Sequence, residues 1–232
     1  KKYDEVSRML KGQPNTPISI TVERSGESQP LVRSLVREEI TIPNVPYYGM
    51  IDQQQGYIRL GSFTDDAAKE VKAAMEDLVQ KKGAKGVILD LRGNPGGLLN
   101  EAVDIVNVFI DKGQEVVSTR GKIKEWDKIY RSQHPATDNK TPIVVLVNSG
   151  SASASEIVSG ALQDLDRAVI VGQRTFGKGL VQTTRPLTYN AQLKITTAKY
   201  YIPSGRCIQA LDYTHRNPDG SVGKVPDSLI SS

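Results

Sequence analysis

The chain has 232 residues, of which 38% are hydrophobic and 24% charged, a balance that is typical of a folded globular protein and excludes general disorder. The 30 basic and 26 acidic residues give a net charge of +4, and the basic residues are scattered, so we expect no basic stripe for nucleic acid. A single cysteine, Cys207, excludes an internal disulfide framework and a cysteine-rich zinc site, and no apolar run is long enough to span a membrane.

The first 42 residues predict a helix followed by two strands. Apolar residues at helical spacing indicate a helix over residues 1–12, and residues 18–24 and 31–42 are typical of strands joined by a turn. Prolines at positions 43 and 46 mark a boundary.

Strands and helices alternate after this boundary, which predicts an α/β core in which helices pack on a sheet. A polar segment, residues 120–141, is expected to form a surface loop or ribbon. The expected helices cover residues 64–78, 96–110 and 153–165. The expected strands cover residues 57–61, 86–91, 115–119, 143–147, 168–171, 179–187 and 192–202.

A Gly/Ser cluster, SGSASASE, follows the apolar strand at residues 143–147. If Ser153 begins the next helix, the amide of Ala154 belongs to the first turn, where N–H groups have no intrahelical partner. A donor at the positive end of a helix dipole can bind the oxyanion of an acyl-transfer intermediate. A Gly/Ser turn is also a common helix cap, so this cluster alone does not establish catalysis.

Lys178 lies twenty-five residues after Ser153, between two glycines, and its neighbours are Phe176 and Leu180 rather than carboxylates. Burial and a nearby helix N-terminus both disfavour the charged form of a lysine, so a lysine in apolar surroundings can act as a general base. Gln182 would share the strand face of Lys178 and could hold the neutral amine by a hydrogen bond. The alternative interpretation is an ordinary solvated lysine.

A second oxyanion donor could come from LDLRGNPGG, residues 89–97, which leaves a strand through a flexible loop into a helix. Gly96 and Gly97 would both offer backbone amides there. A tight turn without a catalytic role is the alternative interpretation of this stretch.

Other site types find less support. The spacing from Gly172 to Lys178 matches a phosphate-binding P-loop, but Gly179 replaces the Ser/Thr that would hold magnesium and a β-prone stretch follows, so we expect no nucleotide. The two histidines, His134 and His215, lie in polar or turn-rich segments and are expected to be exposed, which makes a His-based triad or a zinc site improbable.

Three motifs in order, LDLRGNPGG, GSASASE and RTFGKG with LVQ, resemble those of the carboxyl-terminal processing (tail-specific) serine peptidases, over about residues 56–206. The resemblance implies that Ser153 is the nucleophile, Lys178 the general base and Gln182 the residue that orients this lysine. It places the oxyanion amides at Ala154 and Gly97, and it implies neither a metal nor a cofactor.

Glu156 belongs to the same motif, but we assign it no chemistry. An acidic residue that faces the helix dipole from the first turn is a sufficient explanation for it.

The resemblance also implies a crotonase-like (ClpP/crotonase-type) α/β core, with a mixed sheet and packed helices, over residues 43–232. Residues 1–42 resemble the C-terminal remnant of a PDZ domain. The carboxylate-binding loop and the peptide-pairing strand that normally precede this helix are absent, which removes support for peptide capture by strand addition in that unit. We expect the chain to be a piece of a longer protein, truncated at its C-terminal end as well.

The implied function is that of a serine endopeptidase, which would cleave peptide bonds near the apolar C-terminus of protein substrates through an acyl-enzyme. The implied location is periplasmic or otherwise extracytoplasmic in a bacterium. The implied partners are protein or peptide substrates with apolar C-terminal tails. A second copy of the chain, in a homo-oligomer, or an adaptor is a further implied partner. Neither nucleic acid nor a nucleotide is expected. The alternative is a catalytically silent peptide-binding module of the same fold.

Overall fold

The computed structural model describes residues 3–40 and 42–224, and the chain divides into two compact units, Lys1–Ile42 and Pro43–Ser232. The expected helix at residues 1–12 and the expected strand at residues 31–42 each extend onto residues outside the described part. The identification of the first unit as a PDZ remnant stays a prediction.

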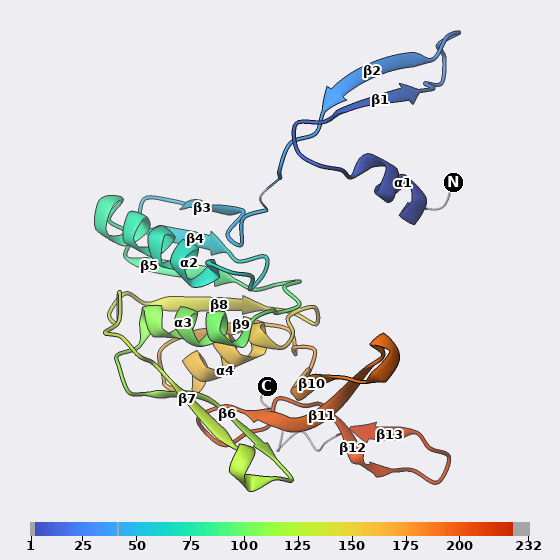
Figure 1. Ribbon diagram of the computed structural model, residues 1–232. Coiled ribbons are helices and arrows are strands. Elements are labelled where there is room, and N and C mark those ends of the chain that lie inside the picture. The colour runs from blue at the N-terminus through green and yellow to red at the C-terminus, as the bar shows by residue number, and fades with distance from the viewer. Residues whose placement is uncertain (1–2, 41, 225–232) are drawn as a thin grey trace. The chain divides into compact units, whose positions relative to one another are not determined.

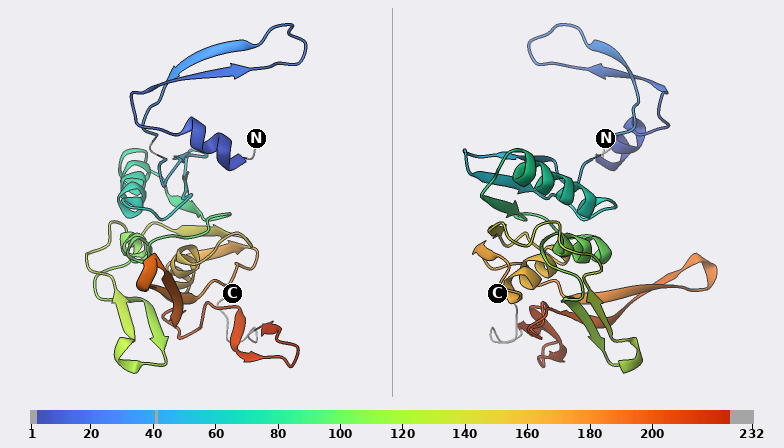
Figure 2. Two further views of the ribbon diagram at one scale, coloured as in Figure 1. Left: turned by 45° about the vertical axis from the view of Figure 1, so that its right-hand side comes forward. Right: turned by 90° about the vertical axis from the view of Figure 1, so that its left-hand side faces the viewer.

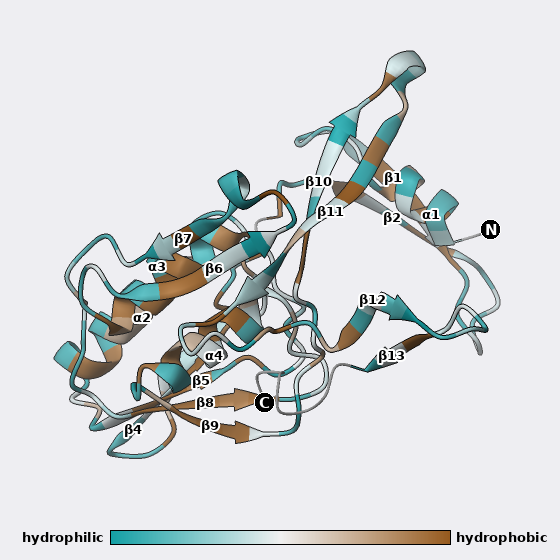
Figure 3. Ribbon diagram, turned by 90° about the horizontal axis from the view of Figure 1, so that it is seen from below, coloured by the Kyte–Doolittle hydropathy of each residue, from teal (hydrophilic) through white to brown (hydrophobic). Residues whose placement is uncertain are grey.

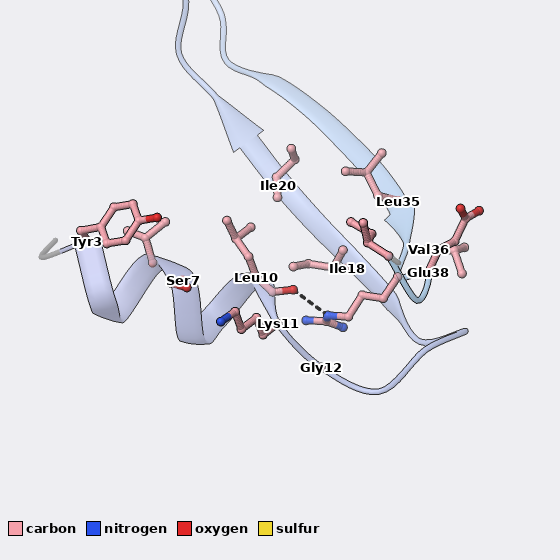
Figure 4. A pocket seen from close by; sticks show the side chains of 13 residues that line it. Tyr3, Ser7, Leu10, Lys11, Gly12, Ile18, Ile20, Leu35, Val36 and Glu38 are labelled. Atoms are coloured by element: carbon pink, nitrogen blue, oxygen red, sulfur yellow. Dashed lines mark hydrogen bonds between the residues drawn. The ribbon is translucent and has the colours of Figure 1, made fainter. Parts of the chain in front are cut away.

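The first unit consists of helix α1 (Tyr3–Leu10) and an antiparallel hairpin of β1 (Pro17–Val22) and β2 (Leu31–Val36). Arg37 joins the helix to the hairpin, because its guanidinium donates to Leu10 O (2.9 Å) and to Thr16 Oγ1 (3.0 Å). A groove of about 700 Å³ lies between α1 and the hairpin, and Figure 4 shows the aliphatic side chains that face it. No side chain of α1 is buried, so this unit has little core of its own.

A five-stranded sheet forms the frame of the second unit, with the strand order β3-β4-β5-β8-β9. The first pair is antiparallel and the remaining pairs are parallel. Figure 3 shows that β8 and β9 are strongly hydrophobic. The strands are β3 (Tyr47–Met50), β4 (Gln55–Arg59), β5 (Gly86–Asp90), β8 (Ile143–Val147) and β9 (Val169–Gly172).

Three helices cover this sheet on one face, as Figure 1 shows. They are α2 (Ala67–Glu76), which continues as a short π-helical turn at Asp77–Lys81, α3 (Leu99–Phe109) and α4 (Ala154–Asp164). Side chains in β8 alternate between buried and half-buried, as a sheet covered on one face requires. The fully buried large side chains all belong to the second unit and include Ile58, Phe63, Leu89, Phe109, Ile157 and Leu162.

A second, four-stranded antiparallel sheet lies on the other side of α3 and α4, with the order β10-β11-β6-β7 (Figure 1). Its strands are β6 (Glu115–Gly121), β7 (Lys128–Arg131), β10 (Leu180–Pro186) and β11 (Gln192–Tyr201). Two 3₁₀ turns, η2 (Lys124–Trp126) and η3 (Thr188–Asn190), join these strands, and a small hairpin of β12 (Leu211–Arg216) and β13 (Val222–Lys224) follows.

The predicted α/β class is confirmed, and the observed elements differ from the expected ones at their ends. Helix α3 begins at Leu99 rather than Gly96, because Gly97 forms an isolated β-bridge with Phe63 and Leu98 is extended. The segment 120–141 contains η2 and β7, so it forms a ribbon with β6. Among the described helices, none is both long and apolar enough to cross a membrane.

Candidate active site

Three serines of the SASAS run lie at the start of α4, and two of them bind the loop after β5. The Ser151 hydroxyl donates to Leu91 O (2.8 Å), and the Ser155 hydroxyl donates to Asn94 O (3.0 Å); both side chains are fully buried. Ser153 is half-buried; its side chain forms a capping box with Glu156, and among the described residues its hydroxyl donates no hydrogen bond. Of the three, Ser153 is therefore the serine whose hydroxyl is left for chemistry.

Ser153 has an uncommon backbone conformation, with φ 57° and ψ −112°. An L-residue rarely adopts a positive φ, and such strain persists only where the surrounding structure imposes it. The Ser153 N–H donates to Glu156 Oε2 (2.8 Å), and its C=O accepts the N–H of Ile157 (3.0 Å). These bonds hold the side chain of Ser153 at the strand-to-helix turn, as the sequence predicts.

The Glu156 carboxylate links this turn to the segment that carries Lys178. Its Oε1 accepts the Gly177 N–H (2.6 Å) and the Thr175 hydroxyl (2.7 Å). Its Oε2 accepts the N–H of Lys178 (2.8 Å) as well as that of Ser153 (2.8 Å). Because both nitrogen atoms lie 2.8 Å from one oxygen atom, they are at most 5.6 Å apart.

Glu156 is a residue whose role the sequence analysis missed. We expected a first-turn acid that faces the helix dipole, whereas its carboxylate is almost fully buried and accepts four hydrogen bonds. Burial raises the pKa of Glu156, and the bonds from Thr175, Lys178, Gly177 and Ser153 act against this shift. The position of Glu156 in the first helical turn predicts an acid near the Ser153 amide. No pattern in the sequence shows that residues 175–178 fold back to contact the carboxylate of Glu156.

The Lys178 side chain is exposed, so the burial that would lower the pKa of a lysine is not present in this arrangement. It faces a cavity of about 460 Å³ that Phe176, Leu180 and Gln182 also line. The glycines on either side of Lys178 are the buried residues of this turn, and they leave the long side chain on the surface. Within the described part of the chain, no hydrogen bond joins the Ser153 and Lys178 side chains.

Gln182 lines the same cavity as Lys178, as its predicted place on the shared strand face requires. Its amide nitrogen donates to Thr196 Oγ1 at 3.5 Å, and no hydrogen bond to Lys178 is present among the described residues. The predicted contact that would orient the lysine is therefore not formed in this arrangement.

Two backbone amides are free beside Ser153. The Ala154 and Gly97 N–H groups have no hydrogen-bond partner among the described residues, whereas the Gly96 N–H donates to Asn94 Oδ1 (2.9 Å). Gly96 has φ +93°, and a Cβ on it would lie 2.6 Å from Ala152 O and 2.8 Å from Ala154 N. The two turns are thus in contact, and Gly97 rather than Gly96 retains an unused amide.

Asn94 holds these two turns together and is a second residue that the sequence analysis missed. It is buried, and its amide group donates to Leu60 O (2.8 Å) while accepting from Gly96. Its backbone C=O accepts the N–H of Ala152 (3.0 Å). An asparagine directly before Pro-Gly-Gly indicates a turn, but the partners of its side chain come from other parts of the chain.

An ion pair fixes the start of the same loop. The Arg92 guanidinium donates to both carboxylate oxygens of Asp90 (2.7–3.1 Å), and the Tyr57 hydroxyl donates to Oδ2 (2.7 Å). Burial acts to raise the pKa of Asp90, but the hydrogen bonds from Arg92 and Tyr57 outweigh it and hold this pKa below its usual range. Asp90 is therefore a charged anchor at the end of β5.

The structure gives the alternative site types no support. Strand β10, not a helix, follows Lys178, so no helix N-terminus faces a phosphate there. His134 and His215 are exposed, and among the described residues no group of three or more His, Cys, Asp or Glu side chains could hold a metal ion.

Comparison with known proteins adds independent evidence. The model of peptidase family S41 matches residues 54–217. A carboxy-terminal-processing protease of Bartonella bacilliformis is 43% identical over 91% of this chain and 49% of that protein. A probable CtpA-like serine protease of Staphylococcus aureus is 41% identical over 90% of this chain and 41% of that protein.

A solved structure of a photosystem II D1 C-terminal processing protease superposes with a TM-score of 0.66 at 32% identity, covering 88% of this chain and 56% of that one. The chain thus spans about half the length of the curated relatives it matches. The family match, the identities and the placement of the three motifs around one turn agree, and the chain belongs to peptidase family S41.

Proposed function

We propose that this chain carries the catalytic site of a serine endopeptidase that processes the C-termini of proteins. Ser153 Oγ attacks a peptide carbonyl carbon, and its proton passes to the neutral amine of Lys178. The Ala154 and Gly97 N–H groups bind the oxyanion. The amine leaves with the proton from Lys178, and water then hydrolyses the acyl-enzyme, with Lys178 again as the base.

One observation carries this proposal: Glu156 Oε2 accepts the backbone N–H groups of both Ser153 and Lys178. The two residues are separated by twenty-five positions in the chain, yet their nitrogen atoms are at most 5.6 Å apart. A lysine side chain on its flexible four-carbon stem can span such a gap. We propose that a rotation of the Lys178 side chain, without a change of backbone, brings its amine to Ser153.

Gln182 would act after this rotation. It lines the cavity of Lys178, and its amide oxygen can accept a hydrogen bond from the lysine amine. The present hydrogen bond from the Gln182 amide nitrogen to Thr196 Oγ1 is long, at 3.5 Å, so breaking it to bind Lys178 would cost little free energy.

Processing of C-termini is the activity for which the relatives named above are named, and substrates with apolar C-terminal tails are our proposal from the resemblance of the motifs. We also propose a crotonase-type core, a PDZ-like identity for residues 1–42 and an extracytoplasmic location. A homo-oligomer or an adaptor is proposed for the whole protein. This chain matches 49% and 41% of the length of the two curated relatives named above.

The base is tested by Lys178→Ala, with Lys224→Ala as the matched control because Lys224 lines the same cavity. Turnover of an unstructured protein substrate should disappear in Lys178→Ala and persist in Lys224→Ala, while circular dichroism and the Tm stay unchanged in both. Unchanged turnover in Lys178→Ala would refute its assignment as the base.

A catalytically silent peptide-binding module is the second candidate, since the Ser153 and Lys178 side chains are not hydrogen-bonded in this arrangement. Binding of the same substrate with no cleavage, in the native chain and in Ser153→Ala alike, would favour this candidate.

A further inference from the structure

Strand β10 presents a free edge. It pairs with β11 on one side, and no strand of the described chain pairs with its other side. Alternate residues along 180–185 therefore point their N–H and C=O groups away from the sheet, as a template for another strand; Pro186, which has no N–H, ends it. Figure 2 shows the hairpin of β10 and β11, in orange, projecting from the second unit.

The free edge begins at the candidate active site. Just before it, the edge is occupied, because the Ala210 N–H donates to Gly177 O (3.1 Å) and the Gly179 N–H donates to Gln209 Oε1 (2.9 Å). Strand β10 starts at Leu180, two residues after Lys178, whose backbone is held to Glu156. A strand added along β10 would therefore end beside Ser153 and Lys178.

A cavity of about 290 Å³ opens on one face of the same strand. Val181, Thr183 and Arg185, which share this face of β10, form one wall. Leu99, two residues after Gly97, and Trp126 of η2 belong to the lining as well. The cavity thus extends from the edge strand toward the loop that offers the second oxyanion amide.

The charges around this cavity balance. The lining contains two acidic residues, Glu125 and Asp127, and two basic residues, Lys128 and Arg185, while Val181, Leu99 and Trp126 supply apolar surface. The lining therefore carries no excess of either sign of charge that would attract a charged ligand. An uncharged, apolar side chain is the occupant that such a lining accepts at least cost.

We propose that an extended segment of the substrate pairs as an additional strand with the outer edge of β10, and that its alternate side chains enter the cavity beside Val181 and Thr183. This inference rests on the proposed function. Main-chain hydrogen bonds would hold an unfolded chain independently of its sequence, and the cavity would select apolar side chains at every second position. Residues directly opposite each other on paired strands share a face, so the period of two follows from the geometry.

N-methyl scanning of a cleaved peptide tests the pairing without a change to the protein. A methyl group on one amide nitrogen removes one donor, so kcat/KM should fall roughly two- to tenfold at alternate positions and stay unchanged between them. Equal kcat/KM at all positions, or losses confined to the scissile bond, would overturn the strand pairing. Equal kcat/KM at all positions is also the result expected if a second copy of the chain occupied the edge of β10. Cleavage that persists in Ser153→Ala, or no cleavage of the parent peptide, would instead overturn the proposed function.

The cavity is tested by a matched pair of variants, Thr183→Trp and Thr184→Trp. Thr183 lines the cavity, whereas Thr184 is exposed on the opposite face of the same strand. Thr183→Trp should raise KM about tenfold for peptides with large apolar side chains at the selected positions and less for peptides with alanine there. Thr184→Trp should change KM less than Thr183→Trp does, and by the same factor for both kinds of peptide. Equal effects of the two variants, or none from Thr183→Trp, would overturn the assignment of the cavity.

Discussion

A single carboxylate, that of Glu156, organises the candidate site at the scale of residues. It accepts the N–H of Ser153, the N–H groups of Gly177 and Lys178, and the hydroxyl of Thr175. Because all four partners are donors, the site needs an acceptor with four lone-pair positions, which a carboxylate supplies and a carboxamide does not. Glu156 thus acts as a positioning residue, through the backbones of two other residues.

Glu156→Gln should lower kcat by roughly a hundredfold. The glutamine NH2 group would replace one acceptor oxygen and meet backbone N–H donors, and this repulsion would displace Lys178 from Ser153. KM should change little, because Glu156 is not among the residues that line the two cavities at β10. The matched control is Glu70→Gln, which changes a half-buried carboxylate that accepts three hydrogen bonds at the start of α2. If steady-state kinetics show an equal loss of kcat in both variants, Glu156 contributes only to the stability of the fold and does not position Lys178.

The pH dependence of stability follows from the same group. Burial raises the pKa of Glu156 above that of an unfolded glutamate, so the folded state binds this proton more tightly. The stabilising contribution is full below the unfolded pKa and is lost as the pH rises through the raised pKa. The Tm of the native chain relative to Glu156→Gln should therefore fall as the pH rises above the pKa of an unfolded glutamate, about 4.3. A constant difference in Tm, measured by thermal denaturation, would mean that the pKa is not raised.

At the scale of elements, the site depends on the contact between the turn after β5 and the start of α4. Gly96→Ala should lower the free energy of unfolding by roughly 1–2 kcal/mol for its positive φ and by roughly 1–3 kcal/mol more for the clash with Ala152 and Ala154. Gly93→Ala is the matched control, since Gly93 has φ +71° and a Cβ there would meet nothing within 4 Å. Chemical denaturation that shows equal losses in both would contradict the close packing of the two turns.

The elements themselves were largely predictable from the sequence. Periodicity predicts α4 with its first residue at the candidate nucleophile, and alternation predicts β10 directly after Lys178. The start of α3 was predicted too early, because the bridge between Gly97 and Phe63 is a tertiary contact. Strand β3 was missed, since Tyr47–Met50 is short and lies between the boundary prolines and a turn.

The candidate site could be predicted less completely. The motifs identify Ser153, Lys178 and two amide donors, and their resemblance to a family supplies the roles. The exposure of Lys178 and the contact of Gln182 with Thr196 depend on side-chain rotation, which no spacing in the sequence encodes. Asn94 and Glu156 were missed because their partners lie on distant segments.

At the scale of the whole molecule, the candidate site is built within one unit. The fully buried large side chains belong to the second unit, and every residue of the proposed machinery lies between Gly97 and Gln182. The first unit carries an apolar groove but no buried helix residue (Figure 4). The second unit therefore supplies both the core and the chemistry, and the proposed substrate edge, β10, lies on it as well.

Cleavage by the native chain and by Ser153→Ala, followed by mass spectrometry, tests the central claim most directly. The substrate is an unstructured protein that ends in apolar residues, and the fold of the variant is checked by circular dichroism. We predict that the native chain releases C-terminal fragments of the substrate and that Ser153→Ala releases none. Equal fragmentation by both, or an intact substrate with both, would contradict a catalytic role for Ser153 in this chain.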